Sequence, residues 1–217
     1  METEAPLLLV IDVLEQLGVT YCIGGSFASS VYGEPRMTRD ADIVMALRLQ
    51  HVVPFFDALA PAFYVQLEDV QDVVARAQTI GDDLYAHATC NLLHRVTFFK
   101  IDCFIAPNRS FDQQQLIRRI AKPLSMTSSR TVYFTSAEDS ILAKLAWYAA
   151  SNGALERQWS DVRAIIKAQA STLDRAYLDD WATRIGVRPL LDAVFQTDRP
   201  LRLSDGDSLP EQTRLDL

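Results

Sequence analysis

The sequence lacks the features of a membrane-spanning or exported protein. None of its apolar runs approaches the roughly 20 residues that a helix needs to cross a bilayer. The first four residues, Met1-Glu2-Thr3-Glu4, are acidic, whereas a signal peptide begins with basic residues. We therefore expect a cytoplasmic protein with no membrane segment.

Cysteine, histidine and positive charge are all scarce. The 217 residues include three cysteines and three histidines, and none of them follows a zinc-site spacing. Cys22, Cys90 and Cys103 each lie in an apolar, strand-like stretch, which predicts buried free thiols in a reducing compartment. Lys and Arg number 21 against 28 Asp and Glu, a net charge of −7. This excess of acid disfavours a protein devoted to binding duplex DNA, because such binding neutralises phosphates with basic side chains.

Apolar residues make up 49% of the sequence and charged residues 23%, proportions that predict a globular protein with a substantial core. Their periodicity predicts an α/β part followed by a helical part. The expected boundaries are residues 1–108 for the α/β domain, 109–195 for the helical domain and 196–217 for an irregular tail. Within the α/β domain the expected strands are 19–23, 41–47, 89–93 and 98–105, the last two forming a hairpin.

The first candidate functional feature is the junction Gly24-Gly25-Ser26 between a predicted strand and a predicted helix. Two glycines allow a backbone to approach a ligand closely, and a helix N-terminus presents unpaired N–H groups to an anion. The junction is therefore a candidate phosphate cradle. Taken alone, it is better explained as a tight turn in which Ser26 caps the helix.

The second feature is the pair Asp40 and Asp42, which leads into a predicted strand. Residues two apart in a strand point to the same face, so the two carboxylates project together and repel one another unless a cation lies between them. Mg²⁺ is the natural cation because it prefers hard oxygen ligands and is usually shared with substrate phosphates. A second Asp-x-Asp, Asp205 to Asp207, lies in the polar tail and is assigned to a solvated turn.

The third feature is Asp102, a lone carboxylate inside an otherwise apolar predicted strand. Burying a single Asp is costly, so it requires a partner. Lys100 lies two residues earlier on the same face, and a structural Lys–Asp pair is one explanation. The other is that Asp102 meets Asp40 and Asp42 across the sheet and completes a metal site.

These three features together resemble the active-site pattern of the nucleotidyltransferase superfamily, which shares the DNA polymerase β-like fold. The stretch from Arg36 to Asp42 is similar to the R-x-T-x-D-x-D form of its small prokaryotic, abortive-infection-toxin-like members. Further similarity lies in three segments of the sequence: Cys90-Asn91-Leu92-Leu93-His94, Ala137-Glu138-Asp139-x-x-Leu142-x-Lys144-Leu145-x-Trp147-Tyr148 and Gln158-Trp159-x-Asp161-Val162. The resemblance covers roughly residues 7–170. It implies the α/β nucleotidyltransferase fold, a small mixed sheet flanked by helices, followed by a C-terminal helical domain.

The resemblance also implies roles for individual residues. Gly24, Gly25 and Ser26 would hold the phosphates of an NTP, and Asp40, Asp42 and Asp102 would bind two Mg²⁺ ions, for which Mn²⁺ can substitute. Arg39, Lys100 and Lys144 are further candidates for contacting the nucleotide. For each of the three an alternative stays open: Arg39 as a loop residue, Lys100 as the neutralising partner of Asp102, and Lys144 as a surface lysine.

The implied reaction transfers NMP from an NTP to a hydroxyl of a protein, a tRNA or a small molecule. The acidic charge leans against tRNA. Two alternatives remain: a non-catalytic nucleotide-binding or toxin–antitoxin interaction module of the same fold, and a metal-dependent phosphohydrolase. The Gly-Gly-Ser junction and the absence of a histidine cluster count against the phosphohydrolase.

Overall fold

The computed structural model describes residues 4–38, 40–81, 87–106, 108–125 and 130–197. The chain divides into two units: residues 1–31 with 35–136, and residues 32–34 with 137–217. Within the described ranges, no helix combines the length and the apolar character needed to cross a membrane.

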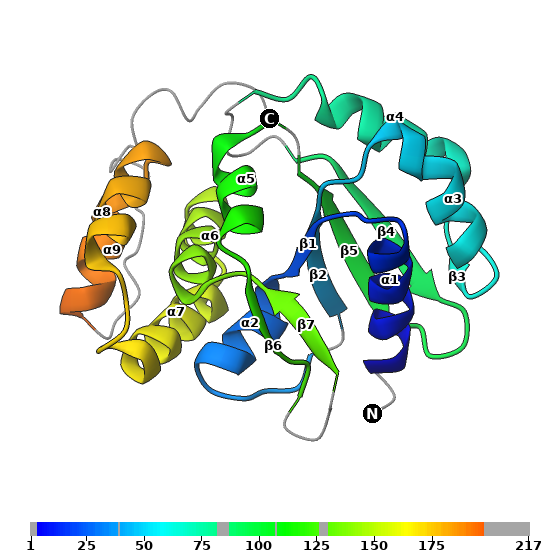
Figure 1. Ribbon diagram of the computed structural model, residues 1–217. Coiled ribbons are helices and arrows are strands. Elements are labelled where there is room, and N and C mark those ends of the chain that lie inside the picture. The colour runs from blue at the N-terminus through cyan, green and yellow to red at the C-terminus, as the bar shows by residue number, and fades with distance from the viewer. Residues whose placement is uncertain (1–3, 39, 82–86, 107, 126–129, 198–217) are drawn as a thin grey trace. The chain divides into compact units, whose positions relative to one another are not determined.

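A mixed sheet forms the centre of the first unit (Figure 1). Among the described residues it has seven strands in the order β3-β4-β5-β2-β1-β7-β6. β2 pairs with β5, and β1 with β7, in parallel, while all other neighbours are antiparallel. The strands are β1 (Tyr21–Ile23), β2 (Asp40–Met45), β3 (Phe63–Tyr64), β4 (Thr89–His94), β5 (Lys100–Ile105), β6 (Ile120–Pro123) and β7 (Thr131–Phe134). The predicted hairpin is confirmed as β4 and β5.

One face of the sheet carries the main core. Strict alternation in β2 and β5 places Ile43 and Met45 beside Cys103 and Ile105, and each of these side chains is at most 2% exposed. Helix α4 (Leu67–Ala77) packs against β4 and β5, and α3 (Leu49–Leu59) packs against both α4 and α1 (Glu4–Gln16). The periodic apolar residues of these helices therefore bury this face.

The opposite face of the sheet is covered at two places and holds the polar residues between them. Helix α5 (Ser110–Ile117) contacts β1 and β2, where Leu116 packs with Val44 and Phe104. Helix α2 (Gly25–Tyr32) lies toward the start of β5, and its Phe27 ring meets the Phe99 ring edge-on at 6.4 Å between centroids. One strand pleat separates the α5 cluster from the carboxylates of β2 and β5.

The second unit is helical. Its helices are α6 (Ala137–Ala150), α7 (Glu156–Gln169), α8 (Arg175–Arg184) and α9 (Arg188–Gln196). α6 packs against α7, α8 and α9. The fold class expected from the sequence, a mixed sheet flanked by helices and followed by a helical part, is confirmed.

The division of the chain differs from the expected boundary after residue 108. Strands β6 and β7 belong to the sheet, so the first unit extends to residue 136. No residue of β6 is buried. The strand therefore has no buried face, and an alternating apolar pattern, which is how a strand is predicted from sequence, is not needed there. The expected irregular tail, with Asp205 and Asp207, lies outside the described residues from 198 onward.

Candidate active site

The register of two parallel strands brings three carboxylates to one face of the sheet. Asp42 of β2 pairs directly with Asp102 of β5, and Asp40 pairs with Lys100. Paired residues of neighbouring strands point to the same face, as do residues two apart in one strand. Asp40, Asp42, Lys100 and Asp102 therefore share a face, which is the arrangement expected from the sequence.

Lys100 supplies the positive charge of this cluster. Its Nζ atom lies 2.8 Å from Oδ2 of Asp102, whose side chain is only 16% exposed, while the Lys100 side chain is 44% exposed. The hydrogen bond to Asp102 raises the pKa of Lys100, and the charges of Asp40 and Asp42 raise it further, against the opposing effect of burial. One ammonium group thus acts on all three carboxylates, as the neutralising role expected for Lys100 requires.

Asp40 has its own local partner. The hydroxyl of Thr38 donates a hydrogen bond of 2.7 Å to Oδ1 of Asp40 and one of 3.1 Å to its backbone oxygen. This contact explains the threonine of the Arg36 to Asp42 stretch, because it fixes the carboxylate at the start of β2. Arg39, between the two, lies outside the described residues.

The Gly-Gly-Ser junction joins β1 to α2 directly beside Asp42. The backbone N–H of Gly24 donates to the backbone oxygen of Asp42 at 2.8 Å, which continues the pairing of β1 with β2. Gly25 has a φ of +54°, and a Cβ atom there would overlap Oδ2 of Asp42. A glycine is therefore required at position 25 both by the backbone conformation and by the approach of the carboxylate.

Gly24 is not required in this way. A Cβ atom at this position would meet Cγ2 of Thr135 at 3.8 Å, an ordinary van der Waals contact. A tight turn thus explains the second glycine of the junction and leaves the first unexplained. An absent side chain at residue 24 is what close approach of a ligand to the backbone needs.

The N-terminus of α2 begins at this junction. The first N–H groups of a helix have no acceptor within the helix, and the helix dipole makes this end positive. In α2 the intrahelical ladder begins where Ala28 N–H donates to the Gly24 oxygen at 3.1 Å. The guanidinium of Arg36 donates to Oγ of Ser26, in the first turn. Positive charge and N–H donors therefore gather beside Asp42.

The donor set suits Mg²⁺, which prefers hard oxygen ligands and usually takes one or two carboxylates together with substrate phosphates. Within the described residues, however, no group of three or more Asp, Glu, His or Cys side chains is arranged to hold a metal ion by itself. Lys100 and Thr38 already bind Asp102 and Asp40. A metal ion at these carboxylates would therefore need further oxygen ligands, such as those of substrate phosphates.

Lys144 has partners within the helical unit. Its Nζ atom lies 2.7 Å from Oδ2 of Asp161 and 3.0 Å from Oε1 of Gln158, and the side chains of Lys144 and Asp161 are 6% and 11% exposed. The lysine is thus not the surface residue of the open alternative. Its partners belong to the Gln158 to Val162 segment, so the pair ties α6 to α7 and favours a structural role.

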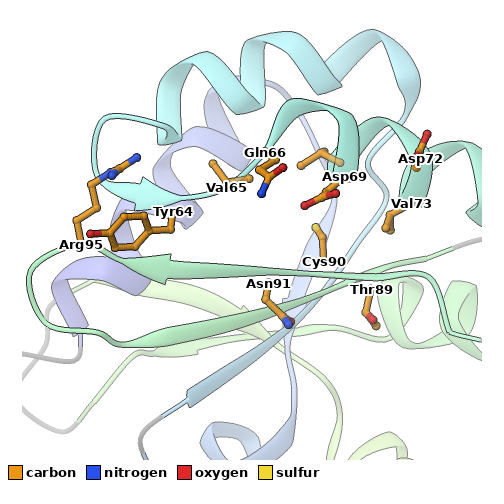
Figure 2. Close-up of a pocket in the computed structure, with 11 residues that line it drawn as sticks. Tyr64, Val65, Gln66, Asp69, Asp72, Val73, Thr89, Cys90, Asn91 and Arg95 are labelled. Carbon is orange, nitrogen blue, oxygen red and sulfur yellow. The ribbon is translucent and has the colours of Figure 1, made fainter.

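A pocket at the edge of the sheet had no signal in the sequence. It has a volume of about 510 Å³ and lies where α4 crosses the outer edge of β4 (Figure 2). β3 pairs only with Leu93 and His94, so in the described part of the chain the edge of β4 before them has no strand beside it. Cys90 of β4 lines this pocket, with Asp69 of α4 above it (Figure 2). The pocket exists because β3 ends before it covers this part of β4, and no sequence motif predicts where β3 ends.

Comparisons with known proteins give likenesses of fold. No protein-family profile and no curated protein matches the sequence. Solved structures that resemble the chain include the following two. The antibiotic-resistance factor ANT(2'')-Ia is 11% identical, with 88% of this chain and 91% of that chain covered and a TM-score of 0.49. The lincosamide antibiotic adenylyltransferase LnuA, with lincomycin bound, is 16% identical, with 75% and 96% covered and a TM-score of 0.43.

Proposed function

We propose that this chain is an Mg²⁺-dependent nucleotidyltransferase that moves NMP from an NTP to a hydroxyl group. One observation carries the proposal: the α2 N-terminus touches Asp42 at Gly25, while Asp42 pairs in register with Asp102. A site for phosphates and a site for the cations that accompany phosphates thus adjoin each other.

Each residue has a role in the proposed reaction. The N–H groups at the start of α2 and the Ser26 hydroxyl bind the β- and γ-phosphates, and Gly24 leaves room for them. Asp40, Asp42 and Asp102 would hold the metal ions, which neutralise the triphosphate and polarise the α-phosphorus when bound. Asp102 accepts the proton of the acceptor hydroxyl as that oxygen attacks in line. The new bond joins the acceptor oxygen to the α-phosphorus, and pyrophosphate leaves.

Lys100 has two positions in this scheme. Without nucleotide its ammonium neutralises Asp102, as the 2.8 Å contact shows. The Lys100 side chain is partly exposed and flexible, so it is free to turn toward an entering phosphate when cations replace it at the carboxylates. The exchange keeps the cluster of like charges balanced in both states.

The acceptor is a protein, a tRNA or a small molecule, and the net charge of −7 leans against tRNA. The three buried free cysteines suit a reducing, cytoplasmic setting. The alternative is a non-catalytic module, nucleotide-binding or paired as in a toxin–antitoxin system, for which the Lys100–Asp102 ion pair would be the permanent state.

The deciding experiment incubates the protein with each α-labelled NTP, Mg²⁺ or Mn²⁺, and fractions of a cell lysate, including the small-molecule fraction. Transfer of label to one fraction, with release of pyrophosphate, supports the proposal. Asp42→Asn is the matched control because it keeps the side-chain volume but is a poor Mg²⁺ ligand. Label transfer that survives in Asp42→Asn contradicts a catalytic site at these carboxylates. So does a wild-type protein that binds nucleotide but labels no fraction.

A further inference from the structure

Two of the three cysteines face each other across neighbouring strands. Cys90 of β4 and Cys103 of β5 are directly paired residues of an antiparallel pair. Both side chains lie on the face of the sheet that the helices bury, and they are 8% and 0% exposed. The two thiols interact with each other through a side-chain hydrogen bond, and both cysteines are free.

The strand geometry permits a disulfide at this pair. Directly opposed residues of antiparallel strands have Cα atoms about 4.5–5.5 Å apart. A disulfide requires about 4.4–6.8 Å, so a change in side-chain torsion suffices and the strands keep their places. Cys22 is excluded from this bond. It lies on β1, beyond β5 and β2, and it pairs with Val44, which faces the other side of the sheet from Cys103.

The pocket at the edge of β4 gives access to one of the two thiols. Cys90 lines this pocket of about 510 Å³, and its sulfur points from β4 toward α4 (Figure 2). Cys103, fully buried on the next strand, does not line it. A small reagent that enters the pocket therefore meets Cys90 first, with Cys103 directly behind it.

From this arrangement we propose that Cys90 and Cys103 form a reversible dithiol–disulfide pair, oxidised by peroxides that enter through the pocket. The Cys90 sulfur attacks one peroxide oxygen, the O–O bond breaks, and the leaving hydroxide takes the thiol proton as water. The Cys103 sulfur then attacks the sulfenic acid of Cys90, the S–S bond forms, and the hydroxyl leaves with the Cys103 proton as a second water. Two thiols lose two electrons and the peroxide gains them.

Access from the pocket supports this order of attack. Cys90 lines the pocket, whereas Cys103 is fully buried on the next strand, so Cys103 is the resolving thiol.

The pair adjoins the candidate active site. Asn91 follows Cys90 on β4, and Asp102 precedes Cys103 on β5. These two residues are also directly paired. A disulfide one residue away fixes the spacing of the two strands beside Asp102. An effect of oxidation on nucleotide transfer rests on the proposed function, whereas formation of the disulfide does not.

The test uses the full-length protein treated with hydrogen peroxide, alkylated, digested without reduction and mapped by mass spectrometry. We expect one intramolecular link between the Cys90 and Cys103 peptides, an alkylated Cys22, and complete reversal by dithiothreitol. The Cys22→Ser variant is the matched control and should give the same link. Because the wild-type map is read without any cysteine variant, the test does not depend on how a variant folds.

A second measurement establishes which thiol is attacked. In Cys103→Ser a cyclic 1,3-dione, which traps sulfenic acids, should label Cys90, whereas in Cys90→Ser it should leave Cys103 unlabelled. Links that involve Cys22 or two molecules, labelling of Cys103 in the Cys90→Ser variant, or a Cys90 that stays fully alkylatable after peroxide treatment would each overturn the proposal.

Discussion

Gly25 and Asp42 approach each other so closely that a Cβ atom on residue 25 would overlap Oδ2 of Asp42. Gly25→Ala should therefore destabilise the fold for two reasons, the positive φ and the collision with the carboxylate. Gly18→Ala is the matched control, because Gly18 has a φ of +66° but nothing within 4 Å of its Cβ position. We expect the control to lose about 1–2 kcal/mol of unfolding free energy in urea, and Gly25→Ala to lose clearly more. Equal losses in the two variants would mean that the Asp42 side chain moves away from the added methyl group at no cost in stability.

A substitution at Gly24 distinguishes the two interpretations of the junction, a phosphate cradle and a tight turn. Since a Cβ on Gly24 would make only an ordinary contact with Thr135, Gly24→Ala should change the unfolding free energy by less than about 1 kcal/mol. If phosphates approach this backbone, the same methyl group should weaken Mg²⁺–NTP binding about tenfold or more, measured by calorimetry. Unchanged nucleotide affinity in a stable Gly24→Ala variant would leave the junction as a turn alone.

Removing Lys100 should make the carboxylates a better metal site in the absence of nucleotide. Lys100→Met takes away the ammonium group at 2.8 Å from Asp102, so Mn²⁺ alone should bind several-fold more tightly than to the wild type. The variant should lose no more than about 1 kcal/mol of stability, since the lysine is 44% exposed. Lys167→Met, at the end of α7, serves as the control for loss of one positive charge. Equal Mn²⁺ affinity in all three proteins would show that Lys100 does not compete with the metal.

Lys144 should contribute to the stability of the fold. Lys144→Met leaves the Asp161 carboxylate buried without its cation, which typically costs about 3–5 kcal/mol. The double variant Lys144→Met with Asp161→Leu should recover most of that loss, because an apolar pair replaces the ion pair. Arg184→Met, which breaks the exposed pair with Asp180, should cost no more than about 1 kcal/mol. A Lys144→Met variant that is stable but binds NTP more weakly would contradict this role and show that Lys144 contacts the nucleotide.

The sequence predicted the parts of the site that depend on short-range periodicity. Spacing by two placed Asp40 with Asp42 and Lys100 with Asp102, and alternation in both strands gave the shared face once β2 and β5 were neighbours. The glycine pair was found but its two members were not told apart. Only the structure shows that the Asp42 carboxylate occupies the Cβ position of Gly25 and not that of Gly24, because that contact joins side chain and backbone on different elements.

Other features were missed because their determinants are long-range. β6 has no buried residue, and β3 has only two residues, so neither carries a strand period. The contact of Cys90 with Cys103 depends on the hairpin register, which a turn without a diagnostic Asn-Gly pair leaves open. The buried state of Lys144 depends on α7, 14 residues further along the chain at Gln158.

The central claim is that Asp40, Asp42 and Asp102 hold metal together with a nucleotide bound at the start of α2. Its most direct test is electron paramagnetic resonance of Mn²⁺ added to the protein with and without a non-hydrolysable NTP analogue. We predict that the analogue tightens Mn²⁺ binding to the wild type, and that Asp42→Asn and Asp102→Asn each weaken this binding at least tenfold, about 1.4 kcal/mol. Asp42→Asn should keep its metal-free stability within about 1 kcal/mol, since it relieves repulsion among the carboxylates. Equal Mn²⁺ binding in wild type and variants, or a metal-free stability loss of several kcal/mol in Asp42→Asn, would contradict the account.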